Sequence, residues 1–156
     1  MHCALRVLRV GPSRAILPVM VSTITLSSAH RVQIEAEARA AFPKECCGLL
    51  EGVRDGNVVR VIAVHPACNL SEDADRFEID PAIQFALMRA LRDTEREIIG
   101  CYHSHPNGKA EPSPRDREGA GEEGFVWLIA GVAAAVTLRA FACCGGEFVP
   151  LALQRA

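Results

Sequence analysis

The sequence has no run of lysine or arginine residues, and its 19 acidic residues slightly outnumber its 17 basic ones. Proteins that bind nucleic acid over a broad surface usually carry a strongly basic balance or a basic stripe. The charge pattern therefore argues against nucleic acid as a partner. A chain of 156 residues suffices for one domain with its own core, and a hydrophobic content of 49% argues against wholesale disorder.

The sequence also lacks any Cys-x-x-Cys pair, although it contains seven cysteines. They are Cys3, Cys46, Cys47, Cys68, Cys101, Cys143 and Cys144. An odd number with two adjacent pairs is not the pattern of a disulfide framework. We therefore expect most of these thiols to be small core residues of a protein in a reducing compartment, the cytoplasm.

No apolar run approaches the roughly 20 residues that a membrane-spanning helix requires, so no membrane partner is expected. Near the start of the chain, Arg6, Arg9 and Arg14 separate short apolar stretches, and no cleavage site follows a sufficient apolar segment. A secretory signal is therefore not predicted. We interpret residues 1–20 as a poorly ordered leader or a misassigned start, and residues 21–156 as the domain.

Capping and turn signals predict the first half of the domain. Ser27 or Ser28 can cap a helix that runs to about Phe42, where Pro43 stops it. Two β-rich runs, 48–53 and 58–65, flank Asp55-Gly56, which is a strong signal for a hairpin turn. A short strand is predicted over 76–79.

The second half continues with one helix and four strands. Asp80-Pro81 is an N-cap followed by proline at the first helical position, and the helix ends before the charged stretch 92–97. Strands are predicted over 98–103, 125–130, 134–141 and 147–153, with Gly145-Gly146 as a turn. The order indicates a mixed α/β domain in which neighbouring strands are often antiparallel.

His103 and His105 are the first candidates for chemistry. Side chains two residues apart on a strand share one face, so both imidazoles can chelate the same ion. Pro106 ends the strand and Asn107-Gly108 turns the chain, which leaves the pair at a strand end open to solvent.

A third ligand is expected from Asp116. Ser113 and Pro114 resemble an N-cap and a first helical position, which places Asp116 in the first turn of a helix. Two nitrogen ligands and one carboxylate would leave the fourth tetrahedral position of a zinc ion open, as catalytic zinc requires. The sequence therefore predicts a catalytic zinc site.

Glu45 stands immediately before an apolar strand, and a carboxylate that enters a core rarely does so without a reason. If the Glu45 carboxylate faces the metal, it can take a proton from the attacking water and pass that proton to the leaving amine. We predict that Glu45 is the general base and later the general acid.

These residues resemble the signature of the JAMM (MPN+) zinc metallopeptidase family: a distant glutamate, then His-x-His, seven residues, serine, two residues and aspartate. Glu45, His103, His105, Ser113 and Asp116 match every position. The strings Glu-Cys-Cys-Gly-Leu-Leu and Tyr-His-Ser-His-Pro are also similar to the family's short prokaryotic members.

The resemblance implies a cytidine-deaminase-like fold, an α/β sheet flanked by helices. It implies that Ser113 stabilises the oxyanion, that His103, His105 and Asp116 bind Zn²⁺, and that Glu45 activates water. The implied substrate is an amide or isopeptide bond at the C-terminal glycine of a ubiquitin-like or sulfur-carrier protein.

The residues of the motif also have simpler interpretations. Ser113 and Asp116 alone could be a helix cap and a first-turn acid, and Glu45 an ordinary carboxylate at a helix end. Their coincidence with His103 and His105 favours the metal site. At the level of function, the alternatives are a non-catalytic MPN-type scaffold and a RadC-like protein associated with DNA.

Other residues near the motif receive simpler assignments. Tyr102 and Trp127 are expected to pack in the core, and Cys101 is expected to be a small core residue rather than a ligand. The resemblance alone implies that Asn69 and the stretch 75–77 border the cleft that holds the metal.

Overall fold

The computed structural model describes residues 20–156, so the predicted leader lies, apart from Met20, outside the described residues. The described chain forms seven strands and three helices. The strands are β1 (Thr23–Leu26), β2 (Cys47–Asp55), β3 (Val58–Ala67), β4 (Glu97–His105), β5 (Val126–Val132), β6 (Val136–Cys144) and β7 (Glu147–Arg155). The helices are α1 (Ser28–Ala41), α2 (Pro81–Ala90) and α3 (Pro114–Gly119).

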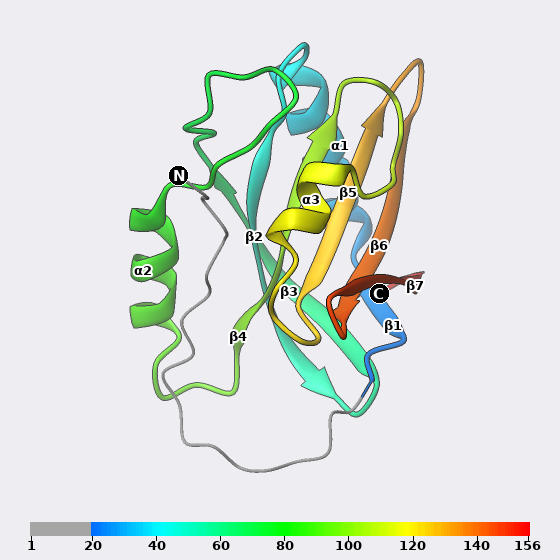
Figure 1. The fold of residues 1–156 in the computed structure, drawn as a ribbon. Helices are drawn as coiled ribbons and strands as arrows, with labels where there is room; N and C mark the ends of the chain where they lie inside the picture. The colour runs from blue at the N-terminus through cyan, green and yellow to red at the C-terminus, as the bar shows by residue number, and fades with distance from the viewer. Residues whose placement is uncertain (1–19) are drawn as a thin grey trace.

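The strands form one sheet in the order β1-β3-β2-β4-β5-β6-β7, which closes into a barrel (Figure 1). Closure comes from a parallel pairing of β1 with β7, in register from Thr23 with Ala152 to Leu26 with Arg155. Strand β4 pairs in parallel with β5, whereas β2 pairs antiparallel with both β3 and β4. A mixed sheet with helices agrees with the prediction, but its closure and strand β1 were not predicted.

The local signals at the first helix and the hairpin are confirmed. Ser27 is the N-cap of α1, and its side chain accepts a hydrogen bond from the backbone N–H of His30 at 3.1 Å. Gly56 turns the chain between β2 and β3 with a φ of 58°, a conformation that glycine adopts without steric cost. Asp80 caps α2, as predicted from Asp80-Pro81.

The two faces of the sheet carry two hydrophobic clusters. Val126 and Leu128 of β5 belong to the cluster that includes Ile34 of α1, whereas Trp127 between them belongs to the cluster that includes Leu87 of α2. This alternation is the period of a strand that is covered on both sides. In Figure 1, α1 lies behind the sheet and α3 in front of it, so α3 shares a face with the second cluster.

The predicted strand over 76–79 is wrong. Its only sheet contact within the described chain is an isolated bridge between Asn69 and Ile79. The reason is local: the side chain of Asn69 occupies the carbonyl of Arg76 and the N–H of Glu78, groups that a ladder would need.

Two further findings concern cysteines and membranes. The six cysteines of the described residues are all free, and Cys47, Cys101 and Cys143 are buried, whereas Cys68 is exposed. No helix within residues 20–156 has the length and apolar character needed to cross a bilayer.

Candidate metal centre

Strand β4 carries the two predicted histidine ligands at its carboxyl end. His103 pairs with Ile129 of β5 and His105 pairs with Gly131, so both imidazoles extend from the same face of the strand. Their Nε2 atoms lie 3.0 Å apart, and both side chains are buried. The structure therefore brings the pair together as predicted.

Helix α3 presents Asp116 to this pair. Ser113 caps the helix, with its Oγ accepting from the Asp116 N–H at 3.1 Å, while the Ser113 N–H donates to Asp116 Oδ2 at 2.7 Å. This capping box fixes the carboxylate. Asp116 Oδ1 lies 3.2 Å from His103 Nε2, and Oδ2 lies 3.2 Å from His105 Nε2.

Glu45 enters the same space from the segment that immediately precedes β2, the strand beside β4. Cys47 pairs with His103, and the N–H of Ser104 donates to the carbonyl of Cys46 at 3.1 Å, which brings Glu45 beside His105. Glu45 is buried, and it forms with His103 and His105 a group whose possible ligand atoms all lie within 4.8 Å of one another. Two carboxylates thus stand beside two imidazoles.

The orientation of His105 follows from its other ring nitrogen. Nδ1 lies 2.8 Å from the carbonyl oxygen of Lys109, so this nitrogen carries a proton and donates it. In the neutral ring, the Nε2 lone pair then faces Asp116 and His103, which is the form that a metal ligand needs.

Within the described chain, the ring of His103 is held by aromatic packing, not by a hydrogen bond to its Nδ1. Phe77 stacks on its ring with centroids 4.4 Å apart, and Trp127 meets it edge-on at 5.9 Å. Its Nδ1 has no hydrogen-bond partner among the described residues. Trp127 therefore packs as predicted, but part of what it packs against is a candidate ligand.

Gly131 allows the loop after β4 to approach. A Cβ at this position would overlap the carbonyl oxygen of Gly108 and lie 2.8 Å from the backbone nitrogen of Ala110. The absence of a side chain thus lets the segment that carries the Lys109 carbonyl lie against β5.

Burial and neighbouring charge set the protonation of the two carboxylates apart. Burial raises the pKa of Glu45 to about 8, against the opposing effect of His105 and with a further increase from Asp116. Burial also acts to raise the pKa of Asp116, but the contacts with the imidazoles of His103 and His105 outweigh it and hold the pKa well below its ordinary value. Asp116 is therefore ionised, whereas Glu45 can hold a proton near neutral pH.

The two histidines also have pKa values that are shifted in opposite directions. Burial lowers the pKa of His103 more than Asp116 raises it, which favours the neutral, metal-binding form. For His105, burial is opposed by Asp116 and by the Lys109 carbonyl, and the pKa is raised. Imidazole nitrogens and carboxylate oxygens converging in a buried space are a donor set that fits a divalent transition metal such as zinc.

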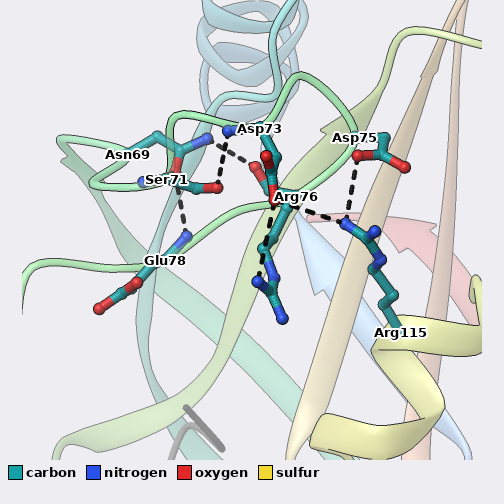
Figure 2. A network of polar contacts seen from close by, with 7 residues as sticks. All are labelled: Asn69, Ser71, Asp73, Asp75, Arg76, Glu78 and Arg115. Atoms are coloured by element: carbon teal, nitrogen blue, oxygen red, sulfur yellow. Dashed lines mark hydrogen bonds and ion pairs between the residues drawn. The ribbon is translucent and has the colours of Figure 1, made fainter. Parts of the chain in front are cut away.

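Phe77, in the stretch 75–77 that the resemblance places beside the cleft, covers His103. Two supporting residues, Ser104 and Arg115, were not predicted from the sequence. Ser104, between the two histidines, contacts the backbone beside Glu45. Arg115, beside Asp116 on α3, pairs with Asp75 of the loop 69–78 (Figure 2). Cys101 lies in the second hydrophobic cluster, as expected of a core residue.

Comparison with known proteins agrees with this geometry. Residues 27–144 match the model of a family described as prokaryotic homologs of the JAB domain. The chain belongs to this family. The resemblance to the JAMM signature is thereby confirmed, and the matched range includes every residue of the centre.

The chain is also similar in sequence to two named proteins and in structure to a solved protein. The JAB-domain chain is 34% identical over 113 residues to "Desampylase" of Haloferax volcanii, covering 69% of the chain and 80% of the relative. It is 44% identical over 80 residues to "Probable TtuB-protein conjugate cleaving protease" of Thermus thermophilus, covering 47% of each. A solution structure of a protein from Desulfitobacterium hafniense superposes with a TM-score of 0.76 at 29% identity, covering 86% of the chain and 93% of that protein.

Proposed function

We propose that this protein is a zinc-dependent JAMM-type isopeptidase that cleaves the bond after the C-terminal glycine of a ubiquitin-like or sulfur-carrier protein. The observation that carries the proposal is the buried convergence of the Asp116 carboxylate on the Nε2 atoms of His103 and His105, with Glu45 beside them. The coarser assignment, a hydrolase of the prokaryotic JAB family, follows from the family match and the named relatives.

The two carboxylates suit different roles. Asp116 contacts both imidazoles at 3.2 Å and is ionised, which favours it as the third ligand. Glu45 has a pKa raised to about 8 by burial, which suits a group that takes and returns a proton near neutral pH.

When bound, zinc supplies a Lewis acid that polarises the scissile carbonyl and lowers the pKa of water. Glu45 takes the proton of the attacking water and then delivers it to the leaving amine. Ser113 uses one lone pair to accept the Asp116 N–H, which leaves its O–H free to donate to the developing oxyanion.

The substrate class follows from the position of the site. A centre at the end of a strand, beside a loop, suits an extended peptide that lies close to the backbone. A tail that ends in glycine brings no Cβ atoms into that space. Relatives named "Desampylase" and "Probable TtuB-protein conjugate cleaving protease" support a protein conjugate as the substrate.

The alternatives have less support. A non-catalytic scaffold would have no need for two carboxylates and two imidazoles buried together, and this chain retains all of them. A RadC-like role with DNA has less support because the sequence contains no basic run.

The free cysteines of the described chain agree with a location of the protein in the cytoplasm.

The test uses a ubiquitin-like carrier joined through its terminal glycine to the side chain of a lysine. A matched conjugate carries Gly→Val at the last two positions of the carrier. We expect the zinc-loaded enzyme to cut the first conjugate and to leave the second intact. Equal cleavage of both, or cleavage of unrelated peptides alone, would remove the glycine-tail specificity and leave only a general metallopeptidase.

A further inference from the structure

The peptide group that joins Glu45 to Cys46 is held at both of its polar atoms. The carbonyl oxygen of Glu45 accepts from Asn69 Nδ2 at 3.0 Å, and the N–H of Cys46 donates to Ser104 Oγ at 2.8 Å. Building on the proposed function, we propose that Asn69 and Ser104 are positioning residues that fix the main chain of Glu45 and so aim its carboxylate.

Asn69 uses the full hydrogen-bonding capacity of its side chain. Nδ2 donates to the carbonyls of Glu45 and Arg76, both at 3.0 Å. Oδ1 accepts from the N–H groups of Ser71 at 2.9 Å and Glu78 at 3.0 Å. A side-chain amide has two donors and two acceptor lone pairs, so none of its capacity remains unused. Figure 2 shows Asn69 at the base of the loop that these bonds close.

The loop 69–78 closed by Asn69 also reaches the other parts of the centre. Phe77 stacks on the ring of His103 with centroids 4.4 Å apart. Asp75 forms an ion pair with Arg115 at 3.2 Å, and Arg115 precedes Asp116 on α3 (Figure 2). Asn69 thus connects the general base to the loop that covers one ligand and contacts the helix of another.

Ser104 holds the same peptide from the opposite side. It lies between the two histidines on β4 and, by the alternation of a strand, its side chain extends from the face opposite to theirs. It is fully buried, and both its Oγ and its N–H bond to the backbone of Cys46, at 2.8 Å and 3.1 Å. A residue next to both ligands therefore sets the distance between β4 and Glu45.

The chemical reason for such a clamp is that Glu45 precedes the first residue of β2 and has no ladder of its own to hold it. A proton acceptor acts well only within hydrogen-bond reach of its target, and a displacement of about 1 Å can lower a rate by about 100-fold. Neither Asn69 nor Ser104 contacts a candidate ligand atom through its side-chain hydrogen bonds, so their removal should affect turnover more than metal binding.

Three substitutions remove different hydrogen bonds to the peptide between Glu45 and Cys46. Asn69→Asp keeps the acceptor side of the amide but replaces the donor to Glu45 with an oxygen, and Asn69→Ala removes both sides. Ser104→Ala removes the acceptor for the Cys46 N–H. Asn57→Asp is the matched control, because Asn57 is exposed and its side chain bonds to Ser22 at 2.7 Å, away from the centre.

We expect Asn69→Asp and Ser104→Ala each to lower kcat by about 10- to 100-fold, with KM changed by less than about 3-fold and zinc content unchanged. In a Glu45→Gln background, Asn69→Asp should cause no further loss, because the group that it positions is already inactive. Independently of turnover, the backbone amide of Cys46 should exchange with deuterium at least about 10-fold faster in the Asn69 and Ser104 variants. Asn57→Asp should match the wild type in every measurement.

The results that overturn the inference are distinct from those that overturn the function. If the wild-type enzyme cleaves the conjugate and Asn69→Asp behaves like Asn57→Asp, Asn69 does not position Glu45. The same conclusion follows if Asn69→Asp lowers the residual rate of Glu45→Gln as much as that of the wild type. If the wild-type enzyme cleaves no conjugate, the proposed function is wrong, and Cys46 exchange alone decides: unchanged exchange in Asn69→Asp contradicts the clamp, and faster exchange supports it.

Discussion

The Nδ1 of His105 donates a hydrogen bond to the carbonyl of Lys109 at 2.8 Å, and that carbonyl is in place because Gly131 leaves room for its loop. This contact holds the ring so that Nε2 faces the centre. Partners of this kind, one step removed from the metal, commonly change metal affinity when they are displaced.

Gly131→Ala should therefore weaken zinc binding by about 10- to 100-fold, because the added Cβ pushes the 108–110 segment away from β5. Competition with a chromophoric chelator would measure the affinity. Gly121→Ala is the control, since a Cβ there meets nothing within 4 Å. An unchanged affinity in Gly131→Ala would show that the Lys109 carbonyl does not govern His105.

Ser113→Ala should lower kcat by about 100-fold or more if its O–H stabilises the oxyanion. The substitution also removes a helix cap, which alone costs about 1 kcal/mol of stability. Ser27→Ala is the matched control, because Ser27 caps α1 through the same kind of bond, at 3.1 Å to the His30 N–H. Both variants should lose similar stability, and only Ser113→Ala should lose turnover. If Ser113→Ala and Ser27→Ala lose similar stability and do not differ in kcat, Ser113 acts only as a helix cap.

Glu51 offers a prediction about pH that does not involve the metal. It is buried, and it accepts hydrogen bonds from His65 Nε2 at 2.8 Å and from Arg96 at 3.0 Å. Burial acts to raise its pKa, but these two partners outweigh it and hold the pKa below its ordinary value of 4.5. A depressed pKa in the folded state stabilises the protein above the unfolded pKa, and this stabilisation is lost as the pH falls through the folded value.

Glu51→Gln should accordingly lower the free energy of unfolding by about 1–3 kcal/mol at pH 7. The difference from the wild type should shrink as the pH falls below 4.5, where the wild-type carboxylate takes up its proton. Urea unfolding at several pH values would measure this. Glu111→Gln is the control, because its pair with Arg139 is exposed and should contribute less than about 1 kcal/mol. A difference for Glu51→Gln that stays constant down to pH 3 would contradict the assigned shift.

The parts of the protein that could be predicted from sequence are those with a local physical signal. The caps at Ser27 and Asp80, the turn at Gly56 and the strand period that pairs His103 with His105 each depend on residues a few positions apart. These signals predicted the helices, most of the strands and the convergence of the candidate ligands.

The remainder depends on contacts between distant segments. Strand β1 is four residues long, and its pairing with β7 joins residues more than 120 positions apart, so nothing local indicates a closed barrel. Asn69 lies 24 positions from Glu45, and its side chain diverts the backbone of 76–78 from the predicted strand. A propensity pattern cannot show that a polar side chain elsewhere will use those backbone groups.

The most direct test of the proposed centre measures bound zinc and conjugate cleavage together in the wild type, Asp116→Asn and Glu45→Gln. Asp116→Asn retains the size of the side chain and a carbonyl that can serve the capping box, so a loss of metal reports the ligand rather than the helix. We predict that Asp116→Asn loses zinc and cleavage together, whereas Glu45→Gln keeps its zinc and loses about 10²- to 10⁴-fold in turnover. Retention of zinc by Asp116→Asn together with its loss from Glu45→Gln, or full turnover by Glu45→Gln, would contradict the roles proposed for the two carboxylates.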